Sequence, residues 1–122
     1  MVVFDSGTYR ITYTPSMTER LQRDLETAVE GDVRFDALTR ALYSTDASVY
    51  KIEPVGVAIV RSREDILRTI ECAREHGCSI TARGGGTSQA GQAIGAGLQV
   101  DTSKYYNKLL EVNVEERWAR VE

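Results

Sequence analysis

Residues 57–101 read VAIVRSREDILRTIECAREHGCSITARGGGTSQAGQAIGAGLQVD, and this stretch decides the fold. The continuous apolar run at 57–60 is typical of a strand that is covered on both faces. A helical pattern follows over residues 64–76, and a second short strand pattern occupies residues 79–82. Because the connections are short, these three elements predict a βαβ unit with parallel strands.

The helix of this unit has clear signals at both ends. Ser62 is a natural N-cap, and Asp65 stands three residues later, where it can reach back to the start of the helix. His76 falls in the last turn, where its charged form favours the helix dipole, and Gly77 follows at the position that ends a helix. The predicted core face of the helix consists of Ile66, Leu67, Ile70, Ala73 and Cys72.

Downstream of this unit the patterns predict strands. Residues 98–101 resemble a third strand. Residues 109–114 and 118–121 favour an antiparallel pair joined at Glu115-Glu116, with Trp118 expected in the core. The chain stops inside the last of these strands, and we interpret this as a truncation.

Upstream, the pattern is mainly helical. Residues 17–30 carry one apolar stripe, with Ser16 as the expected N-cap, Glu19 completing a capping box and Gly31 ending the helix. Charged residues on the other side of this helix predict a solvated face. Residues 2–14 indicate a β-hairpin in which Tyr9, Ile11 and Tyr13 alternate with polar residues and Asp5-Ser6-Gly7 forms the turn.

Residues 36–50 have a less regular pattern. Residues 37–42 fit one or two helical turns, and Ser44-Thr45-Asp46 offers side chains that could cap another short turn through Tyr50. Tyr43, Asp46 and Tyr50 could face a ligand, but packing of the tyrosines and capping by Asp46 are the simpler interpretation.

Together the elements predict an α/β (α+β) fold. Its small parallel βαβ core is preceded by N-terminal helices and followed by a C-terminal antiparallel strand pair. We expect residues 1–50 to be a helical lead-in, residues 54–101 to form the βαβ core with its glycine-rich loop, and residues 102–122 to begin a second subdomain.

Composition excludes several classes of protein. A net charge of −3 argues against a nucleic-acid surface, and no apolar run approaches the length that spans a membrane. The N-terminus lacks the pattern of a secretory signal, so a cytoplasmic protein is expected. Cys72 and Cys78 are best interpreted as reduced thiols, and no metal site is predicted, because four soft ligands are not available.

The loop after the second strand carries the chemistry. Residues 83–91 read RGGGTSQAG, and six of the ten glycines lie between positions 84 and 97. Glycines let successive N–H groups converge on one anion, and they let a ligand approach the backbone closely. Thr87 and Ser88 add hydroxyl donors, and Arg83 adds a fixed positive charge. Ligands of α/β proteins usually bind at this edge of the sheet.

This loop matches neither common phosphate-binding fingerprint. Gln92-Ala93 stands where a P-loop requires lysine and a hydroxyl residue. Gln89 stands at the place of the third Rossmann glycine, and no helix pattern opens at Gly86, although Asp101 has nearly the spacing of a ribose-binding acid. On composition alone, a tight glycine connection that binds no ligand stays open.

Several motifs together resemble a known family. They are VAIVRSREDI at 57–66, His76-Gly77, RGGGTS at 83–88, Gly91-Gln92, Val100-Asp101, KLLEV at 108–112 and ERWARV at 116–121. These motifs resemble the FAD-linked oxidases of the vanillyl-alcohol-oxidase superfamily, whose FAD-binding domain is of the p-cresol methylhydroxylase (PCMH) type. Residues 33–36 and 43–50 look more like the large D-lactate, glycolate and D-2-hydroxyglutarate dehydrogenases of that group.

The resemblance, which covers residues 17–122, implies a cofactor and a reaction. FAD would lie between two subdomains, of which this chain supplies the first and the start of the second. Its diphosphate would be held by Arg83, Gly84, Gly85, Gly86, Thr87, Ser88, Gly91 and Gln92. Thr87 stands where relatives that tether flavin covalently have histidine, so non-covalent FAD is implied. An iron–sulfur cluster is implied for the parent protein, though not in this chain.

The implied activity is oxidation of a D-2-hydroxy acid to a 2-oxo acid by the parent protein. No residue of this chain is predicted to be catalytic, as is usual where the cofactor carries the chemistry. Other flavin oxidases or reductases of the same fold, and a non-catalytic nucleotide-binding or interaction module, stay open as alternatives. We expect the isolated 122-residue chain to be inactive, to bind FAD poorly and to self-associate through residues 109–121.

Overall fold

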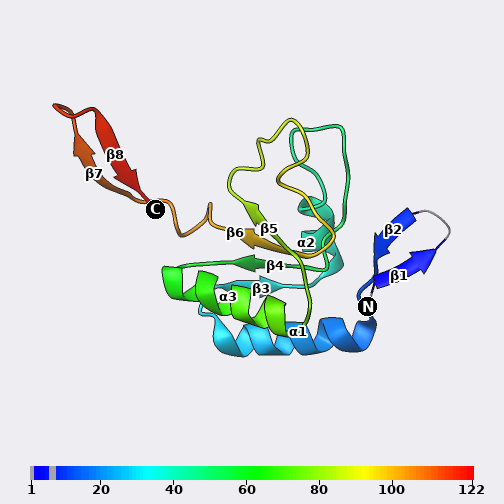
Figure 1. Cartoon of the computed structure of the whole chain (residues 1–122). Coiled ribbons are helices and arrows are strands. Elements are labelled where there is room, and N and C mark those ends of the chain that lie inside the picture. Colours follow the sequence, from blue (N-terminus) through cyan, green and yellow to red (C-terminus); the bar gives the residue numbers. More distant parts are fainter. Residues whose placement is uncertain (1, 6–7) are drawn as a thin grey trace.

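A four-stranded sheet forms the centre of the protein (Figure 1). The computed structural model describes residues 2–5 and 8–122, with side chains from residue 12 onward. The strand order is β3-β4-β6-β5, and β4, β6 and β5 are parallel while β3 is antiparallel to β4. The strands are β3 (Asp32–Arg34), β4 (Gly56–Ile59), β5 (Ile80–Arg83) and β6 (Leu98–Asp101). The predicted α/β class with a parallel core is confirmed.

The order of the strands adds what the local patterns did not contain. The two strands of the βαβ unit, β4 and β5, share a sheet, but β6 lies between them and pairs with both. All four residues of β6 are buried, as a central strand requires. The edge strand β3 was not predicted, because three residues are too few for a periodic pattern.

Two helices cover one face of this sheet (Figure 1). They are α1 (Pro15–Ala28) and α3 (Arg63–Glu75), which pack against each other and bury the main apolar cluster. Leu21 and Leu25 of α1 are fully buried there together with Leu98 of β6. The predicted stripe of the first helix therefore faces the core.

The predicted start of α1 was wrong. Thr14, not Ser16, is the N-cap, and the helix runs from Pro15 to Ala28. Proline suits the first helical turn because its φ is preset and its missing N–H is not needed there. The helix therefore begins before Ser16, and the expected capping box with Glu19 does not form.

For α3 the predicted ends are confirmed and the predicted face is partly wrong. The Ser62 side chain accepts from the Asp65 N–H, and Gly77 has φ +59°. The buried positions include Asp65 and Thr69, whereas Leu67 and Ile70 are 39% and 47% exposed. Polar side chains can occupy the core side because their hydrogen bonds are made within it.

Asp65 shows how this is done. Its carboxylate accepts from the Glu30 N–H through Oδ1 and from the Arg61 N–H through Oδ2, both at 2.9 Å. The side chain is 2% exposed, and it joins α3 to the segment that follows α1. The Thr69 hydroxyl in turn donates to the Asp65 carbonyl at 2.7 Å.

We expect Asp65→Ala to lower the free energy of unfolding by about 2–4 kcal/mol, because two backbone N–H groups lose a charged acceptor in a buried position. Urea denaturation of the protein, followed by circular dichroism, measures this change. Glu64→Ala is the matched control, since Glu64 is exposed and pairs only with Arg68 on the same helix. It should cost under about 0.5 kcal/mol, and an equal loss in both variants would contradict the assignment.

The other face of the sheet carries α2 (Ala37–Leu42) and the loops of the site. The predicted turns at 37–42 are confirmed, with Asp36 as N-cap. The further helical turn expected through Tyr50 does not exist. Residues 44–50 form an open segment without a helix, and an isolated β-bridge pairs Thr45 with Lys51. Asp46 therefore caps no helix.

Two hairpins complete the chain. The predicted C-terminal pair is confirmed as β7 (Leu109–Asn113) and β8 (Trp118–Val121), which stand away from the sheet (Figure 1). Trp118, expected in the core, is 36% exposed, because the hairpin has no second layer against it.

The N-terminal hairpin is also confirmed where the structure describes it. It consists of β1 (Val2–Asp5) and β2 (Thr8–Ile11), paired antiparallel. The expected turn at Ser6-Gly7 and the side-chain alternation of Tyr9 and Ile11 lie outside what is described. None of the helices in the described part of the chain is long and apolar enough to cross a membrane.

Candidate functional site

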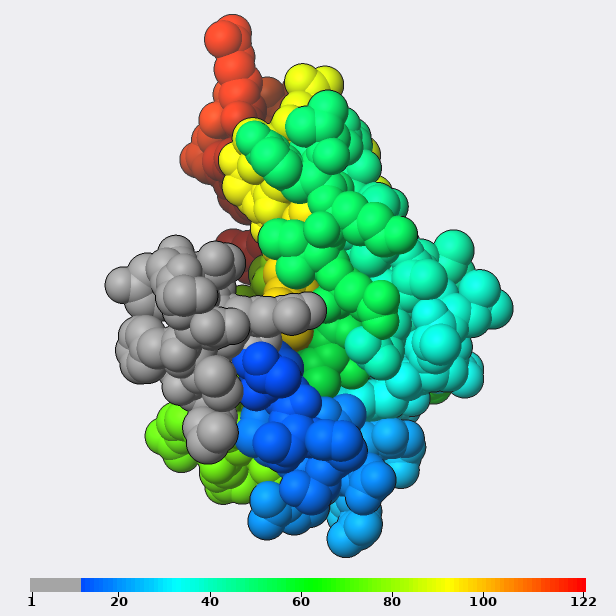
Figure 2. Space-filling view, turned by 90° about the vertical axis from the view of Figure 1, so that its right-hand side faces the viewer, coloured from blue at the N-terminus to red at the C-terminus, as the bar shows by residue number. Residues whose placement is uncertain are grey.

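The glycine loop leaves the carboxyl end of β5 and lies beside the open segment 44–50. The two segments are neighbours in Figure 1 and form one continuous surface in Figure 2, where they are yellow and green. The Ala47 N–H donates to the Gly86 carbonyl at 3.1 Å, which joins them directly. Residues 44–50 thus form a second wall of the candidate site, beside the glycine loop. The sequence predicted the loop, but it did not indicate this second wall.

The glycines of the loop fall into two groups, according to whether the protein itself has room for a side chain at each position. Gly86 and Gly91 have φ of +67° and +81°, and a Cβ would stand 2.5 Å from Arg83 Nη2 in the first and 3.0 Å from the Tyr50 ring in the second. The chain's own conformation therefore requires both. At Gly84 a Cβ would have no neighbour within 4 Å, and at Gly85 only ordinary contact with Thr87.

Gly84 and Gly85 consequently need an explanation outside this chain's own packing. Neither has a left-handed φ, so a larger residue would fit the backbone. Both are exposed and lie in the run that follows β5. A backbone kept bare in open space fits a ligand that must approach it closely, and an anionic diphosphate is the group that such a loop can hold.

Arg83 is the anchor of the loop. Its Nη1 donates to the Thr45 carbonyl at 2.9 Å and to the Ala93 carbonyl at 3.1 Å, and its guanidinium lies over the Tyr43 ring at 5.0 Å. The guanidinium thus connects the second wall, at Thr45, with Ala93 just beyond the glycine loop. Its positive charge lies directly beside Gly86, and direct contact with a diphosphate stays a prediction.

Asp46 completes the same framework from the opposite segment. Its Oδ1 accepts from the Ser48 N–H at 2.9 Å, and its Oδ2 accepts from the Ala93 N–H at 3.3 Å. The hydrogen bonds from Ser48 are the main reason that the pKa of the Asp46 carboxyl lies below its usual value. A carboxylate, rather than a carboxylic acid, therefore closes the site at neutral pH.

The remaining predicted residues form the outer part of the loop. Ser88 Oγ and Gln92 Oε1 share a hydrogen bond, and the Gln92 N–H donates to Ser88 Oγ at 3.1 Å. Thr87 is exposed. The structure thus brings Ser88, Gly91 and Gln92 together at the far end of the loop, while Arg83 fixes its near end.

A buried polar network lies under the second wall. Tyr43 donates to Asp101 Oδ2 at 2.5 Å, and Gln99 Nε2 donates to the Tyr43 carbonyl at 2.7 Å. Burial is the main cause that raises the pKa of Tyr43. Asp101 also accepts from the Ser103 N–H and is 5% exposed. Both carboxylate oxygens of Asp101 thus bind groups of the protein itself, so Asp101 does not have the exposed position of a ribose-binding acid in a Rossmann site.

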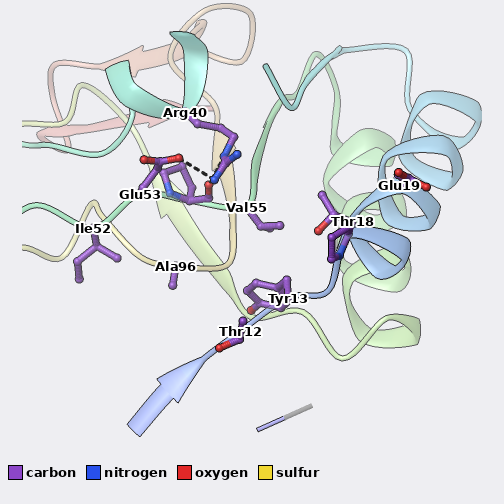
Figure 3. Close-up of a pocket in the computed structure, with 11 residues that line it drawn as sticks. Thr12, Tyr13, Thr18, Glu19, Arg40, Ile52, Glu53, Val55 and Ala96 are labelled. Carbon is purple, nitrogen blue, oxygen red and sulfur yellow. Dashed lines mark hydrogen bonds and ion pairs between the residues drawn. The ribbon is translucent and has the colours of Figure 1, made fainter. Parts of the chain in front are cut away.

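A cavity lies elsewhere, at the amino ends of β4 and β6 (Figure 3). Its volume is about 1000 Å³, and Arg40 and Glu53 form an ion pair of 2.6 Å on its wall. Its lining includes Tyr13, Val55 and Ala96. None of the predicted site residues lines this cavity.

Other candidates from the sequence have structural partners. His76 caps α3, and its Nε2 lies 2.7 Å from Asp24 Oδ2. Cys72 and Cys78 are free and buried, and burial raises the pKa of both thiols. No group of three or more His, Cys, Asp or Glu side chains that could hold a metal occurs among the described residues.

Sequence comparisons match this chain to an FAD-binding family and to dehydrogenases. Residues 54–122 match the family described as "FAD binding domain". The D-2-hydroxyglutarate dehydrogenase of Pantoea ananatis is 37% identical over 120 residues, which are 93% of this chain and 12% of that protein. The enzyme of the same name from Escherichia coli K12 is 39% identical over 95 residues, or 75% of this chain and 9% of that protein.

Solved structures share the fold. The 4-ethylphenol oxidase of Gulosibacter chungangensis superposes with a TM-score of 0.73 at 21% identity, over 89% of this chain and 22% of that one. A p-cresol methylhydroxylase gives a TM-score of 0.69 at 15% identity, with the same shares covered. The predicted PCMH-type fold is thereby confirmed. The chain spans about an eighth of the length of the curated relatives.

Proposed function

This chain belongs to the FAD binding domain family, and from that premise we propose that its glycine loop holds the diphosphate of FAD. The observation that carries the proposal is the bare backbone at Gly84 and Gly85, which the chain's own packing does not require. Backbone N–H groups of residues 84–88 would bind the phosphate oxygens, with Thr87 and Ser88 adding hydroxyl donors.

The other predicted residues would shape and extend this site. Arg83 would hold the near end of the loop and place its positive charge beside Gly86, where it favours an anionic ligand. Gly91 and Gln92 would continue the wall at the far end, where Gln92 is already bonded to Ser88. In this role the chain binds and orients the cofactor, and no residue of it moves a proton.

We propose that the parent protein is a flavin-dependent dehydrogenase that oxidises a D-2-hydroxy acid to the 2-oxo acid. Four relatives at 34–39% identity carry the name D-2-hydroxyglutarate dehydrogenase, which supports this substrate class. When bound, FAD supplies the two-electron acceptor that the oxidation of an alcohol to a ketone needs. An iron–sulfur cluster in the parent, and its cytoplasmic location, stay predictions from the sequence.

The mode of FAD attachment follows from Thr87. A threonine hydroxyl cannot form the covalent bond that a histidine forms in relatives with tethered flavin, so FAD is held non-covalently at this position. Proteolysis of the purified parent should therefore yield no flavin attached to the peptide that contains Thr87.

The proposal is tested with the purified full-length protein. We expect it to be yellow as isolated, and we expect its flavin absorbance to bleach under anaerobic conditions when D-2-hydroxyglutarate, D-lactate or glycolate is added. L-2-hydroxyglutarate is the control, since the opposite configuration should leave the flavin oxidised. A colourless protein, or a flavin that no D-2-hydroxy acid reduces, would contradict the proposal.

A further inference from the structure

We propose that Asp46 is a positioning residue for cofactor binding: it holds the glycine loop in the shape that receives the diphosphate. The inference rests on the proposed function and goes beyond it, because Asp46 itself faces the protein and not the ligand. It also assigns a purpose to residues 44–50, which the sequence analysis interpreted only as capping and packing.

The first support is that Asp46 and Arg83 both bind Ala93, which directly follows the glycine loop and Gln92. The Ala93 N–H donates to Asp46 Oδ2, and the Ala93 carbonyl accepts from Arg83 Nη1. Both backbone groups of Ala93 therefore have a charged partner, the Asp46 carboxylate for its N–H and the Arg83 guanidinium for its carbonyl. Hydrogen bonds with a charged partner are stronger than neutral ones, so this pair fixes where the glycine loop ends.

The second support is the connection between Asp46 and the middle of the loop. Asp46 also binds the Ser48 N–H, which shapes the turn next to Ala47. The Ala47 N–H then donates to the Gly86 carbonyl. Through these contacts one carboxylate determines both the middle and the end of the loop. Gly86 follows directly on the two glycines that leave the backbone bare, so a shift of Ala47 would displace the binding surface.

The third support is energetic. A loop that is already held in its binding conformation loses less conformational freedom when the ligand arrives, and its affinity is higher for that reason. Residues 84–91 are rich in glycine, which is the residue with the most freedom to lose. Without Asp46 the loop would keep its sequence and its N–H groups, but it would lose part of this preorganisation.

The test compares Asp46→Asn with Asp36→Asn in the full-length parent. Asp36 is a matched control because it also accepts from a nearby backbone N–H, that of Thr39, and the pKa of its carboxyl is also below its usual value. Unlike Asp46, it caps α2 and does not contact the loop. FAD is removed, and the dissociation constants of FAD and of ADP are measured by titration. The thermal midpoint of the FAD-free protein is recorded for each variant.

We expect Asp46→Asn to raise the dissociation constant of FAD at least tenfold and that of ADP by a similar factor, because both ligands carry the diphosphate. Asp36→Asn should leave both constants within twofold of the original protein. The thermal midpoint of the FAD-free protein should be nearly the same in both variants, which separates cofactor positioning from a general loss of structure.

A second variant covers the case in which Asp46→Asn does not fold. Asp46→Ser keeps a short acceptor for the turn at Ser48 but is too short to keep the contact with Ala93, and we expect the same loss of FAD affinity. Unchanged FAD affinity in the Asp46 variants, or an equal loss in Asp36→Asn, would overturn the inference alone. An original protein that binds no FAD would instead overturn the proposed function.

Discussion

Gly84→Val should weaken FAD binding by the full-length protein at least a hundredfold without destabilising the fold. A Cβ at this position meets no atom of the chain within 4 Å, and the backbone is not in the left-handed region, so valine fits the protein itself. The same methyl groups would stand where the diphosphate has to approach the N–H groups. We expect the dissociation constant of FAD to rise at least a hundredfold, or about 2.8 kcal/mol.

Flavin content after purification and titration of FAD into the FAD-free variant measure this effect, and thermal unfolding monitors the fold. Gly77→Val provides the reverse control. Gly77 has φ +59° at the end of α3, before the amino end of β5, whereas the glycine loop leaves the carboxyl end of that strand. Valine there should therefore lower stability by about 1–2 kcal/mol and leave FAD affinity unchanged. A Gly84→Val protein that still purifies yellow would contradict the diphosphate assignment.

The parts of the fold that could be predicted are those with a local signal. The apolar run at 57–60, the Ser62 cap and the glycine at 77 each act within a few residues, and all three were interpreted correctly. The start of α1 was misjudged because Ser16 and Pro15 both give start signals. Proline at the first helical position takes precedence, since it fixes the backbone there.

The second wall of the site could not be predicted, for a physical reason. Arg83 contacts Thr45 and Ala93 through their carbonyl oxygens, and Ala47 reaches Gly86 through backbone atoms on both sides. Every residue has these groups, so such contacts leave no signature in residue type. Only Asp46 had a chemical signal, and its side chain suits a helix cap as well as a bridge to a distant loop.

The core face of α3 shows a similar limit. Apolar periodicity pointed to Leu67 and Ile70, but the side that packs on the body contains Asp65 and Thr69. The hydrogen bonds that make Asp65 suitable for burial come from Arg61 and Glu30, and Glu30 lies in another segment. Thr69 is satisfied by donating to the Asp65 carbonyl. Periodicity counts apolar residues, and it cannot register that a polar residue is already satisfied.

The loss of the remaining walls should have the largest effect of all: a polypeptide of residues 1–122 should bind FAD at least a thousandfold more weakly than the full-length protein and should show no turnover. In the proposed site the loop would bind only the diphosphate, whereas ribose, adenine and isoalloxazine would need contacts from other segments. Losing contacts worth about 4 kcal/mol is enough for a thousandfold change. Any part of the loop that must be ordered by the ligand adds about 1–2 kcal/mol per residue.

The same polypeptide should self-associate through residues 109–121. The hairpin stands away from the sheet, and its apolar side chains are all more than a third exposed: Leu109, Leu110, Val112, Val114, Trp118 and Val121. Exposed apolar side chains on strands with open edges favour pairing with another copy. Replacing Val112 and Val121 by lysine should make the polypeptide monomeric in sedimentation experiments, because like charges would then meet in the interface.

Calorimetric titration of residues 1–122 with FAD decides the affinity, with the full-length protein measured in parallel. The lysine variant should be titrated as well, because it separates weak binding from occlusion by a second copy. Micromolar or tighter binding by either polypeptide would show that the loop held by Arg83 and Asp46 is sufficient for FAD. Weak binding by both would place the rest of the affinity in the other segments of the parent protein.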